Sequence, residues 1–422
     1  MASSNETSYL GLIKRNTSFR RLWMGNVISL FGDWFNTIAL YSLILRLTGS
    51  EFALGAVFIT KMLPWALSAP FAGLLVDRFD RRKLMIWSDL LRAVVVLGLL
   101  LVDEASEIYL VYVITTVQVV IGSVFHPAQS ASIPNITSRR ELVTANTIMA
   151  ATWSLLLTIG AALGGFATEY LGIEAVFIID SASYLLSAFF IYRAVIPQNT
   201  DTQRGPVRLG AVLRDILDGW NHVRVNPRIG RITLSKAMWV VAGGGLVYML
   251  ALLGEELAPG REAAAIGLLF AARGLGTGIG PIISRAIFKN RAHWPTVLGG
   301  CIALTGIGYT VVGLIDWTYL VVLPVIVAHS AGGVNWVLSS VMLQERTEDR
   351  FRGRVFSTEW LLIMSVDTLS ILTASLVLEG TVLILRQVIL IFAAVQLFSG
   401  LIWLFSVVPR ERREEMTVDS AL

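Results

Sequence analysis

The sequence is short of charge. Of its 422 residues only 15% are Asp, Glu, Lys or Arg, whereas 55% are hydrophobic. A soluble protein carries about 25% charged residues, and a soluble surface of this size cannot be covered with so few charges. The composition also excludes an intrinsically disordered chain, a collagen-like fibre and a coiled coil.

Cysteine is almost absent as well. The single Cys301 excludes an intrachain disulfide and a cysteine-based metal cluster. The four histidines are scattered without the spacing of metal ligands. No phosphate-binding loop of the Gly-x-x-x-x-Gly-Lys-Ser/Thr type and no nucleophile–base pair occurs. We therefore expect no enzyme, no metal, no cofactor and no ATP-driven pump.

Long apolar runs take up most of the chain instead. A membrane-spanning helix needs about 20 consecutive, mostly apolar residues. The sequence contains twelve such segments, so the predicted fold class is an all-α membrane protein with twelve transmembrane helices. The segments lie near 20–47, 53–76, 84–102, 108–132, 143–168, 173–195, 232–254, 263–284, 294–315, 317–343, 355–378 and 384–408.

The distribution of charge predicts the orientation in the membrane. Most of the 34 basic residues fall in one set of loops and at the two termini, whereas the opposite loops hold only Arg46, Arg261 and Arg386 and are rich in acids. Loops rich in Lys and Arg stay in the cytoplasm. We therefore expect both termini and the central loop to be cytoplasmic. Because the basic residues are spread over many loops, nucleic-acid binding is not expected.

The chain also repeats itself weakly. Gly73-Leu-Leu-Val-Asp77-Arg78 follows the second span, and Gly280-Pro-Ile-Ile-Ser284-Arg285 follows the eighth. Two pseudo-symmetric six-helix bundles are therefore predicted, at 1–195 and 232–422. The linker at 196–231 carries apolar residues at helical spacing from Leu209 to Val223, which predicts an amphipathic helix on the cytoplasmic lipid surface.

The loop after the second span carries the strongest motif. It reads Gly73-Leu-Leu-Val-Asp77-Arg78-Phe-Asp80-Arg81-Arg82-Lys83. This stretch resembles the Gly-x-x-x-Asp-Arg-x-Gly-Arg-Arg/Lys pattern of the major facilitator superfamily, with Asp80 where the family usually has Gly. The resemblance implies a cytoplasmic gate that latches the two halves. Its residues would be Gly73, Asp77, Arg78, Arg81 and Arg82.

Four shorter stretches resemble the drug–proton antiporter branch of that superfamily, which includes macrolide, siderophore and peptide-antibiotic exporters. A lysophospholipid transporter group shares part of the pattern. The span-five stretch Gly160–Gly165 keeps its small residues but lacks the proline that antiporters often have there. The stretches are Phe31-Gly32-Asp33, Trp87-Ser88-Asp89-Leu-Leu-Arg92-Ala93, Phe125-His126-Pro127-Ala128 and Arg352-Gly353-Arg354-Val355-Phe356-Ser357.

Ionisable residues inside the spans are functional candidates, because each costs at least about 2.5 kcal/mol near the bilayer centre. Counting from the helix ends places Asp33 and His329 near the midplane. The resemblance puts their spans beside a central cavity. A carboxyl or an imidazole there can exchange a proton. Asp33 is thus a candidate for proton coupling or for a structural partner of a neighbouring span, and His329 for coupling or for a helix contact.

Three further charges are candidates for ion pairs within the membrane: Lys61, Arg273 and Asp367. The resemblance makes Lys61–Asp367 a gate contact, and a static packing pair is the alternative. Asp180 is expected to be a polar helix contact. Lys236 and Glu359 lie near the cytoplasmic ends of their spans, where snorkelling would satisfy them.

Several of the twelve tryptophans lie deep in the spans. Trp34, Trp239 and Trp336 are candidates for an apolar substrate cavity, and lipid-facing packing is the alternative for them.

The sequence thus favours a monomeric secondary transporter of the bacterial inner membrane that exports small amphipathic compounds or drugs in exchange for protons. Movement of lysophospholipid or siderophore is an alternative, as is a non-transporting sensor or scaffold on the same fold.

Overall fold

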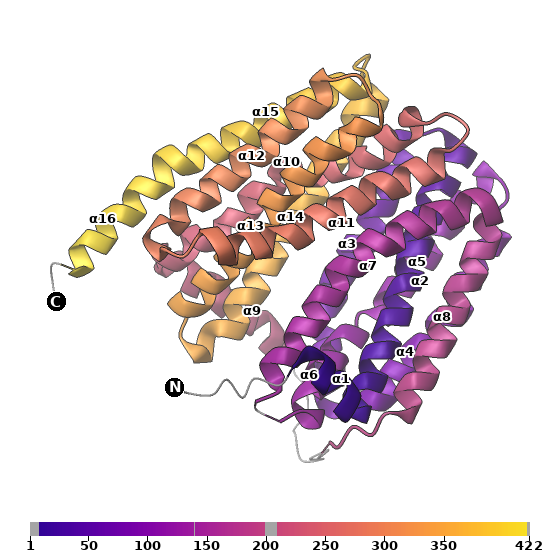
Figure 1. The fold of residues 1–422 in the computed structure, drawn as a ribbon, viewed down its shortest axis with the longest axis horizontal. Coiled ribbons are helices and arrows are strands. Elements are labelled where there is room, and N and C mark those ends of the chain that lie inside the picture. The colour runs from indigo at the N-terminus through magenta and orange to yellow at the C-terminus, as the bar shows by residue number, and fades with distance from the viewer. Residues whose placement is uncertain (1–7, 139, 199–208, 420–422) are drawn as a thin grey trace. The chain divides into compact units, whose positions relative to one another are not determined.

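The computed structural model describes residues 8–138, 140–198 and 209–419. Within them twelve helices are long and apolar enough to cross a membrane, as the sequence predicted. Figure 1 shows these helices in chain order. Contacts divide the chain into an N-terminal unit, 1–49 with 60–207, and a C-terminal unit, 50–59 with 208–422.

The N-terminal unit contains the first six spans. A short helix, α1 (Tyr9–Arg15), precedes them. Span four is broken into two helices, α5 and α6, with Ser123 and Val124 between them. The helices are α2 (Thr17–Thr48), α3 (Glu51–Arg78), α4 (Arg81–Val96), α5 (Ile108–Gly122), α6 (Phe125–Ile136), α7 (Leu142–Leu171) and α8 (Ile173–Arg193).

The C-terminal unit contains the other six spans and the linker helix α9 (Leu209–Val225). A π-helical turn, Trp403–Val407, interrupts span twelve and leads into α16 (Val408–Asp419). The remaining helices are α10 (Pro227–Leu257), α11 (Glu262–Ile287), α12 (Trp294–Leu314), α13 (Val322–Arg346), α14 (Asp349–Gly380) and α15 (Leu385–Ile402).

The two units pair their helices in the same way. In the N-terminal unit α2 packs on α7 and α8, and α4 packs on α8. The equivalent spans of the C-terminal unit do the same, because α10 packs on α14 and α15, and α12 packs on α15. The two units therefore share one pattern of helix pairing, as the sequence repeat suggested.

Glycine allows α7 to pack closely on α2. A Cβ built on Gly160 would lie 3.0 Å from Trp34 Cβ, and one on Gly164 would lie 2.9 Å from Phe35 Cα. Small residues let helix backbones approach within the membrane. The glycines of the span-five stretch thus bring α7 against α2, beside Asp33, without the proline of the antiporter pattern.

The first turns of α3 belong to the C-terminal unit. Glu379 on α14 accepts hydrogen bonds from Ser50 Oγ at 2.9 Å and from the Phe52 backbone N–H at 3.2 Å. Tyr248 on α10 donates its hydroxyl to the Glu51 carbonyl at 2.6 Å. The Phe52 N–H is one of the first-turn donors that have no partner within the helix, and Glu379 satisfies it.

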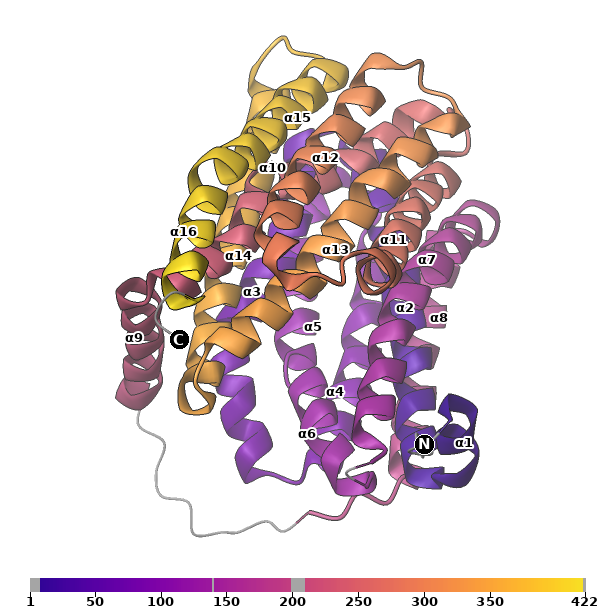
Figure 2. The same cartoon turned by 60° about the vertical axis from the view of Figure 1, so that its left-hand side comes forward.

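The linker helix α9 packs on the start of α14 (Figure 2). Its Gly219 lies against the Arg354 backbone, and the His222 ring stacks on Phe351 at a centroid distance of 4.1 Å. Leu217 and Trp220 remain 62% and 49% exposed, so this end of the helix has an uncovered apolar side. The start of the apolar stripe, at Leu209, Val212 and Leu213, lies outside the described side chains.

Replacing Gly164 with Ala should separate α7 from α2, because the new Cβ would meet backbone atoms that cannot move independently. Overpacking of this kind costs about 1–3 kcal/mol. We expect a lower midpoint of thermal unfolding in mild detergent. Gly300→Ala is the matched control, since a Cβ there has no neighbour within 4 Å. An equal change in both variants would contradict this account of the α2–α7 contact.

Candidate functional site

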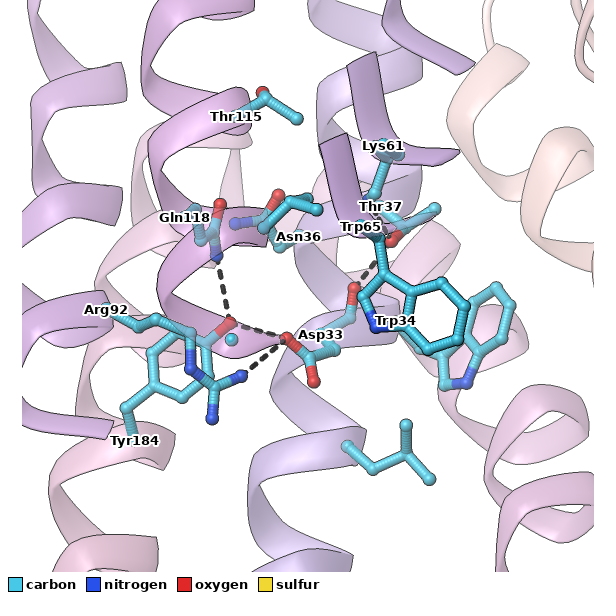
Figure 3. Close-up of a pocket in the computed structure, with 13 residues that line it drawn as sticks. Asp33, Trp34, Asn36, Thr37, Lys61, Trp65, Arg92, Thr115, Gln118 and Tyr184 are labelled. Carbon is cyan, nitrogen blue, oxygen red and sulfur yellow. Dashed lines mark hydrogen bonds and ion pairs between the residues drawn. The ribbon is translucent and has the colours of Figure 1, made fainter. Parts of the chain in front are cut away.

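A cavity of about 260 Å³ lies in the N-terminal unit, among α2, α3, α4, α5 and α8. Figure 3 shows the polar and aromatic side chains that surround it. The lining combines charged groups with two tryptophans. Its labelled residues are Asp33, Trp34, Asn36, Thr37, Lys61, Trp65, Arg92, Thr115, Gln118 and Tyr184.

Asp33 is the carboxyl that the cavity exposes. Its side chain is 38% exposed. One of its oxygens accepts a hydrogen bond from the Tyr184 hydroxyl and lies 3.8 Å from Arg92 Nη1. Gln118 in turn donates its amide to the Tyr184 oxygen at 2.9 Å. Asp33 therefore lies at the boundary between solvent and a buried hydrogen-bond network (Figure 3).

Arg92 joins two carboxylates. It is 6% exposed, and its Nη2 lies 2.5 Å from Asp89 Oδ1. Asp89 is fully buried and also accepts the Ser187 hydroxyl at 2.6 Å. The guanidinium carbon lies 4.3 Å from the centroid of the Tyr184 ring, so the aromatic face adds cation–π stabilisation.

Asp180 adds a third carboxyl directly behind α2. It is fully buried and accepts the Asn36 amide at 2.7 Å. A Cβ on Gly32 would lie 2.6 Å from its Oδ1, so only glycine fits there. Asp180 on α8 therefore makes the polar helix contact expected of it, with Gly32 and Asn36 of α2 on either side of Asp33.

Lys61 supplies the second basic group. Its ammonium donates to Thr37 Oγ1 at 2.6 Å, and that hydroxyl donates to the Asp33 carbonyl at 2.7 Å. The cluster thus contains three carboxyls and two basic groups, and it has one net negative charge when all are ionised. A surplus charge of this kind is costly in a low-dielectric environment.

Three donors on the lining have no hydrogen-bond partner among the described residues. They are Trp34 Nε1, Arg92 Nε and the hydroxyl of Thr115, a residue that is 1% exposed. A buried donor without a partner costs about 1–3 kcal/mol. A ligand with an acceptor group would remove part of that cost.

The remaining candidate residues for coupling and ion pairing belong to the C-terminal unit. His329 is 2% exposed, so it lacks the solvent access expected of a cavity group. Its Nε2 lies 2.9 Å from the Tyr309 hydroxyl, and the Trp239 ring packs edge-on against it. These contacts form the kind of helix interface that was its alternative interpretation.

Asp367 on α14 is 9% exposed and lies against Gly244 of α10. The guanidinium of Arg273 lies 5.9 Å from the Phe270 ring. The pairing of Lys61 with Asp367 stays a prediction, because the two residues belong to different units. The proposed ion-pair role of Arg273 stays a prediction too.

Lys236 and Glu359 do not snorkel, contrary to expectation. Lys236 is 3% exposed and Glu359 is fully buried, and their charged atoms lie 3.0 Å apart. Lys236 also donates to Ser340 Oγ at 2.9 Å and lies 4.6 Å from the Trp336 ring centroid. The two charges pair inside the unit through Glu359 Oε1, so neither has to reach the membrane surface.

Comparison with known proteins identifies the family. Residues 22–366 match the model of the Major Facilitator Superfamily. The chain belongs to this superfamily.

Its relatives include exporters. The chain is 25% identical to an MFS-type transporter of Bacillus subtilis (strain 168), over 85% of each chain. It is 26% identical to a Bacillus amyloliquefaciens protein named for bacilysin export, over 82% of this chain and 84% of the relative. Identity is 23% to macrolide efflux protein A of Streptococcus pyogenes, over 80% and 84% of the two chains.

Solved structures share the fold. A mutant of the peptide transporter POT in complex with alafosfalin matches with a TM-score of 0.76 and 12% identity, over 98% of each chain. A bacterial homologue of the lysosomal transporter Spinster matches with a TM-score of 0.72 and 14% identity, over 95% of this chain and 98% of that one.

The superfamily's loop motif is built around Asp80 here. Asp80, which replaces the usual Gly, is the N-cap of α4 and accepts the Lys83 backbone N–H at 2.9 Å. Arg81 donates to the Ala131 carbonyl at 2.6 Å, and Arg82 to the Ile191 carbonyl at 3.3 Å. These two arginines therefore tie the loop to α6 and α8 within the N-terminal unit.

The other three motif residues, Gly73, Asp77 and Arg78, lie at the end of α3. Arg78 is the last residue of α3, and Gly73 lies on the same helix with open space around it. The side chain of Asp77 lies outside the described ones. The gate role of this motif stays a prediction.

Sequence reasoning missed Arg92, Asp89 and Tyr184 as site residues. A signal was present, because Asp89 and Arg92 stand three residues apart inside a span and so share one helix face. Tyr184 gave no such signal, since its role depends on how α8 packs against α2 and α4.

Replacing Arg92 with Gln leaves the buried Asp89 carboxylate without its cation. Breaking such a pair costs about 3–5 kcal/mol, so the yield of folded protein and the midpoint of thermal unfolding should both fall. The double variant Arg92→Gln/Asp89→Asn should recover most of the loss, since no buried charge is orphaned. A double variant no more stable than the single one would show that Arg92 stabilises the fold in some other way.

Lys236 and Glu359 should be strongly coupled in stability. In a double-mutant cycle with Lys236→Met and Glu359→Leu, we expect a coupling energy of about 3 kcal/mol, near the upper end for contacting residues. The exposed pair Arg291–Glu345, with a distance of 2.6 Å, is the control. Its coupling should stay below about 1 kcal/mol. Similar values for both pairs would refute the buried ion pair.

Proposed function

We propose that this protein is a proton-coupled exporter of small amphipathic compounds that works by alternating access. Superfamily membership and the exporters among its relatives support export as the direction. The observation that carries the coupling is the grouping of three carboxyls with two basic groups, in which Asp33 is the carboxyl exposed to the cavity.

With all three carboxyls and both basic groups ionised, the cluster lacks one positive charge. A proton or a cationic group of the substrate can supply it, and the two therefore compete. Asp33 is the carboxyl at which the exchange takes place, because its side chain is exposed to the cavity whereas Asp89 and Asp180 are fully buried. Protonation of Asp33 removes the attraction for a cationic substrate. Mutual exclusion at one carboxyl is sufficient to couple efflux to proton entry.

Protonation of Asp33 also changes its contacts with neighbouring helices. When ionised it accepts from Tyr184 and attracts Arg92; when protonated it loses the attraction, and Arg92 is left with Asp89. The change therefore reaches α4 and α8. Trp34 and Trp65 supply the aromatic surface against which the apolar part of the substrate packs.

His329 has a supporting role in this proposal, as a buried contact between α12 and α13. In this proposal the basic loops, both termini and the central loop lie in the cytoplasm of a bacterium. Asp33 is accessible from the two sides of the membrane in turn. The protein acts as a monomer, because each chain contains both six-helix units.

The test is transport by purified protein in proteoliposomes with an imposed pH gradient and a panel of cationic dyes, drugs and lysolipids. We expect the wild type to accumulate at least one cationic amphiphile. Asp33→Asn cannot release a proton, so its gradient-driven accumulation should fall to the level of empty vesicles while the unfolding midpoint stays close to that of the wild type.

Asp316→Asn, at an exposed loop carboxyl, is the matched control and should transport normally. Full gradient-driven transport by Asp33→Asn would rule out the coupling role. Transport of lysolipids alone would replace drug export with the lipid alternative.

A further inference from the structure

A second hollow lies in the C-terminal unit, where α11 ends. Its volume is about 360 Å³, and it lies among the end of α11, the α11–α12 loop and α13. The inner wall is apolar and includes Pro281, Val337 and Val341. The rim is basic, since Arg285, Lys289 and Arg291 line it and all three are exposed.

One of these basic residues is already balanced. Arg291 lies 2.6 Å from Glu345, and its guanidinium carbon lies 5.4 Å from the ring centroid of Trp294. The side chains that the structure describes give Arg285 and Lys289 no carboxylate partner. The rim therefore holds two positive charges in excess beside an apolar wall.

The internal repeat explains this excess. Gly280–Arg285 corresponds to Gly73–Arg78, and Ser284 stands where the first copy has Asp77. Ser284 donates its hydroxyl to the carbonyls of Gly280 and Pro281, each at 3.2 Å. The second copy of the loop thus has basic residues but Ser284 in place of an acid, so the motif supplies no carboxylate to Arg285 or Lys289.

The position of the hollow favours a lipid. Trp294 is 9% exposed, and its indole N–H donates to the Phe288 carbonyl at 2.8 Å at the start of a membrane-spanning helix. Tryptophan at span ends lies at the level of lipid headgroups. Basic pockets between helices on the cytoplasmic side bind anionic headgroups, and the basic loops mark this as the cytoplasmic side.

We propose that this hollow binds an anionic glycerophospholipid, with the phosphate between Arg285 and Lys289 and the glycerol and first acyl carbons against Pro281, Val337 and Val341. Arg291, held by Glu345 and Trp294, forms the fixed side of the headgroup site. The site is separate from the cavity at Asp33 and does not depend on what the protein transports.

Native mass spectrometry of the detergent-solubilised full chain tests the site, with phosphatidylglycerol, phosphatidylcholine and inorganic phosphate as separate probes. We expect saturable retention of phosphatidylglycerol over phosphatidylcholine. Each basic residue near an anionic lipid contributes about 1 kcal/mol. Arg285→Gln/Lys289→Gln should therefore weaken phosphatidylglycerol binding by about thirtyfold.

Lys14→Gln/Arg15→Gln removes the same charge from exposed positions on α1 and is the matched control. It should bind phosphatidylglycerol like the wild type. Unchanged binding by the Arg285/Lys289 variant, or an equal loss in the control, would overturn the site. Inorganic phosphate that displaces phosphatidylglycerol at equal concentration would show a free-anion site and overturn the lipid.

Discussion

The cost of a charge inside a membrane governs this structure. Each ionisable side chain in a span must find a partner within the bundle, because lipid offers none. In the N-terminal unit the partners form one continuous set, from Asp89 through Arg92 to Asp33 and Tyr184. These contacts connect α8 to both α2 and α4.

The same constraint has a different outcome in the C-terminal unit. There Lys236 and Glu359 balance each other one to one, away from solvent. The pair has one acid for one base, whereas the N-terminal cluster has three carboxyls for two basic groups. The pseudo-symmetric halves are thus alike in helix pairing and unlike in electrostatics.

Local sequence pattern predicted much of this. Twelve spans and their order follow from apolar runs, and the resemblance to the superfamily predicted that Asp33 faces a cavity. The partners of these charges could not be predicted from local pattern. Asp33 and Tyr184, for example, are 151 residues apart and meet only after α2 and α8 have packed. Lys236 was misjudged for the same reason: a helix end in sequence was buried by α13 and α14 in space.

Helix α3 has a mechanical consequence. Its first turns are fixed by Glu379 and Tyr248 of the C-terminal unit, while Lys61, two residues after the last of those turns, belongs to the N-terminal cavity. An α-helix is stiff over so short a length. Residues 51–59 and Lys61 therefore lie on one unbroken helix, so the direction of its first turns also sets the direction in which the Lys61 side chain leaves the backbone.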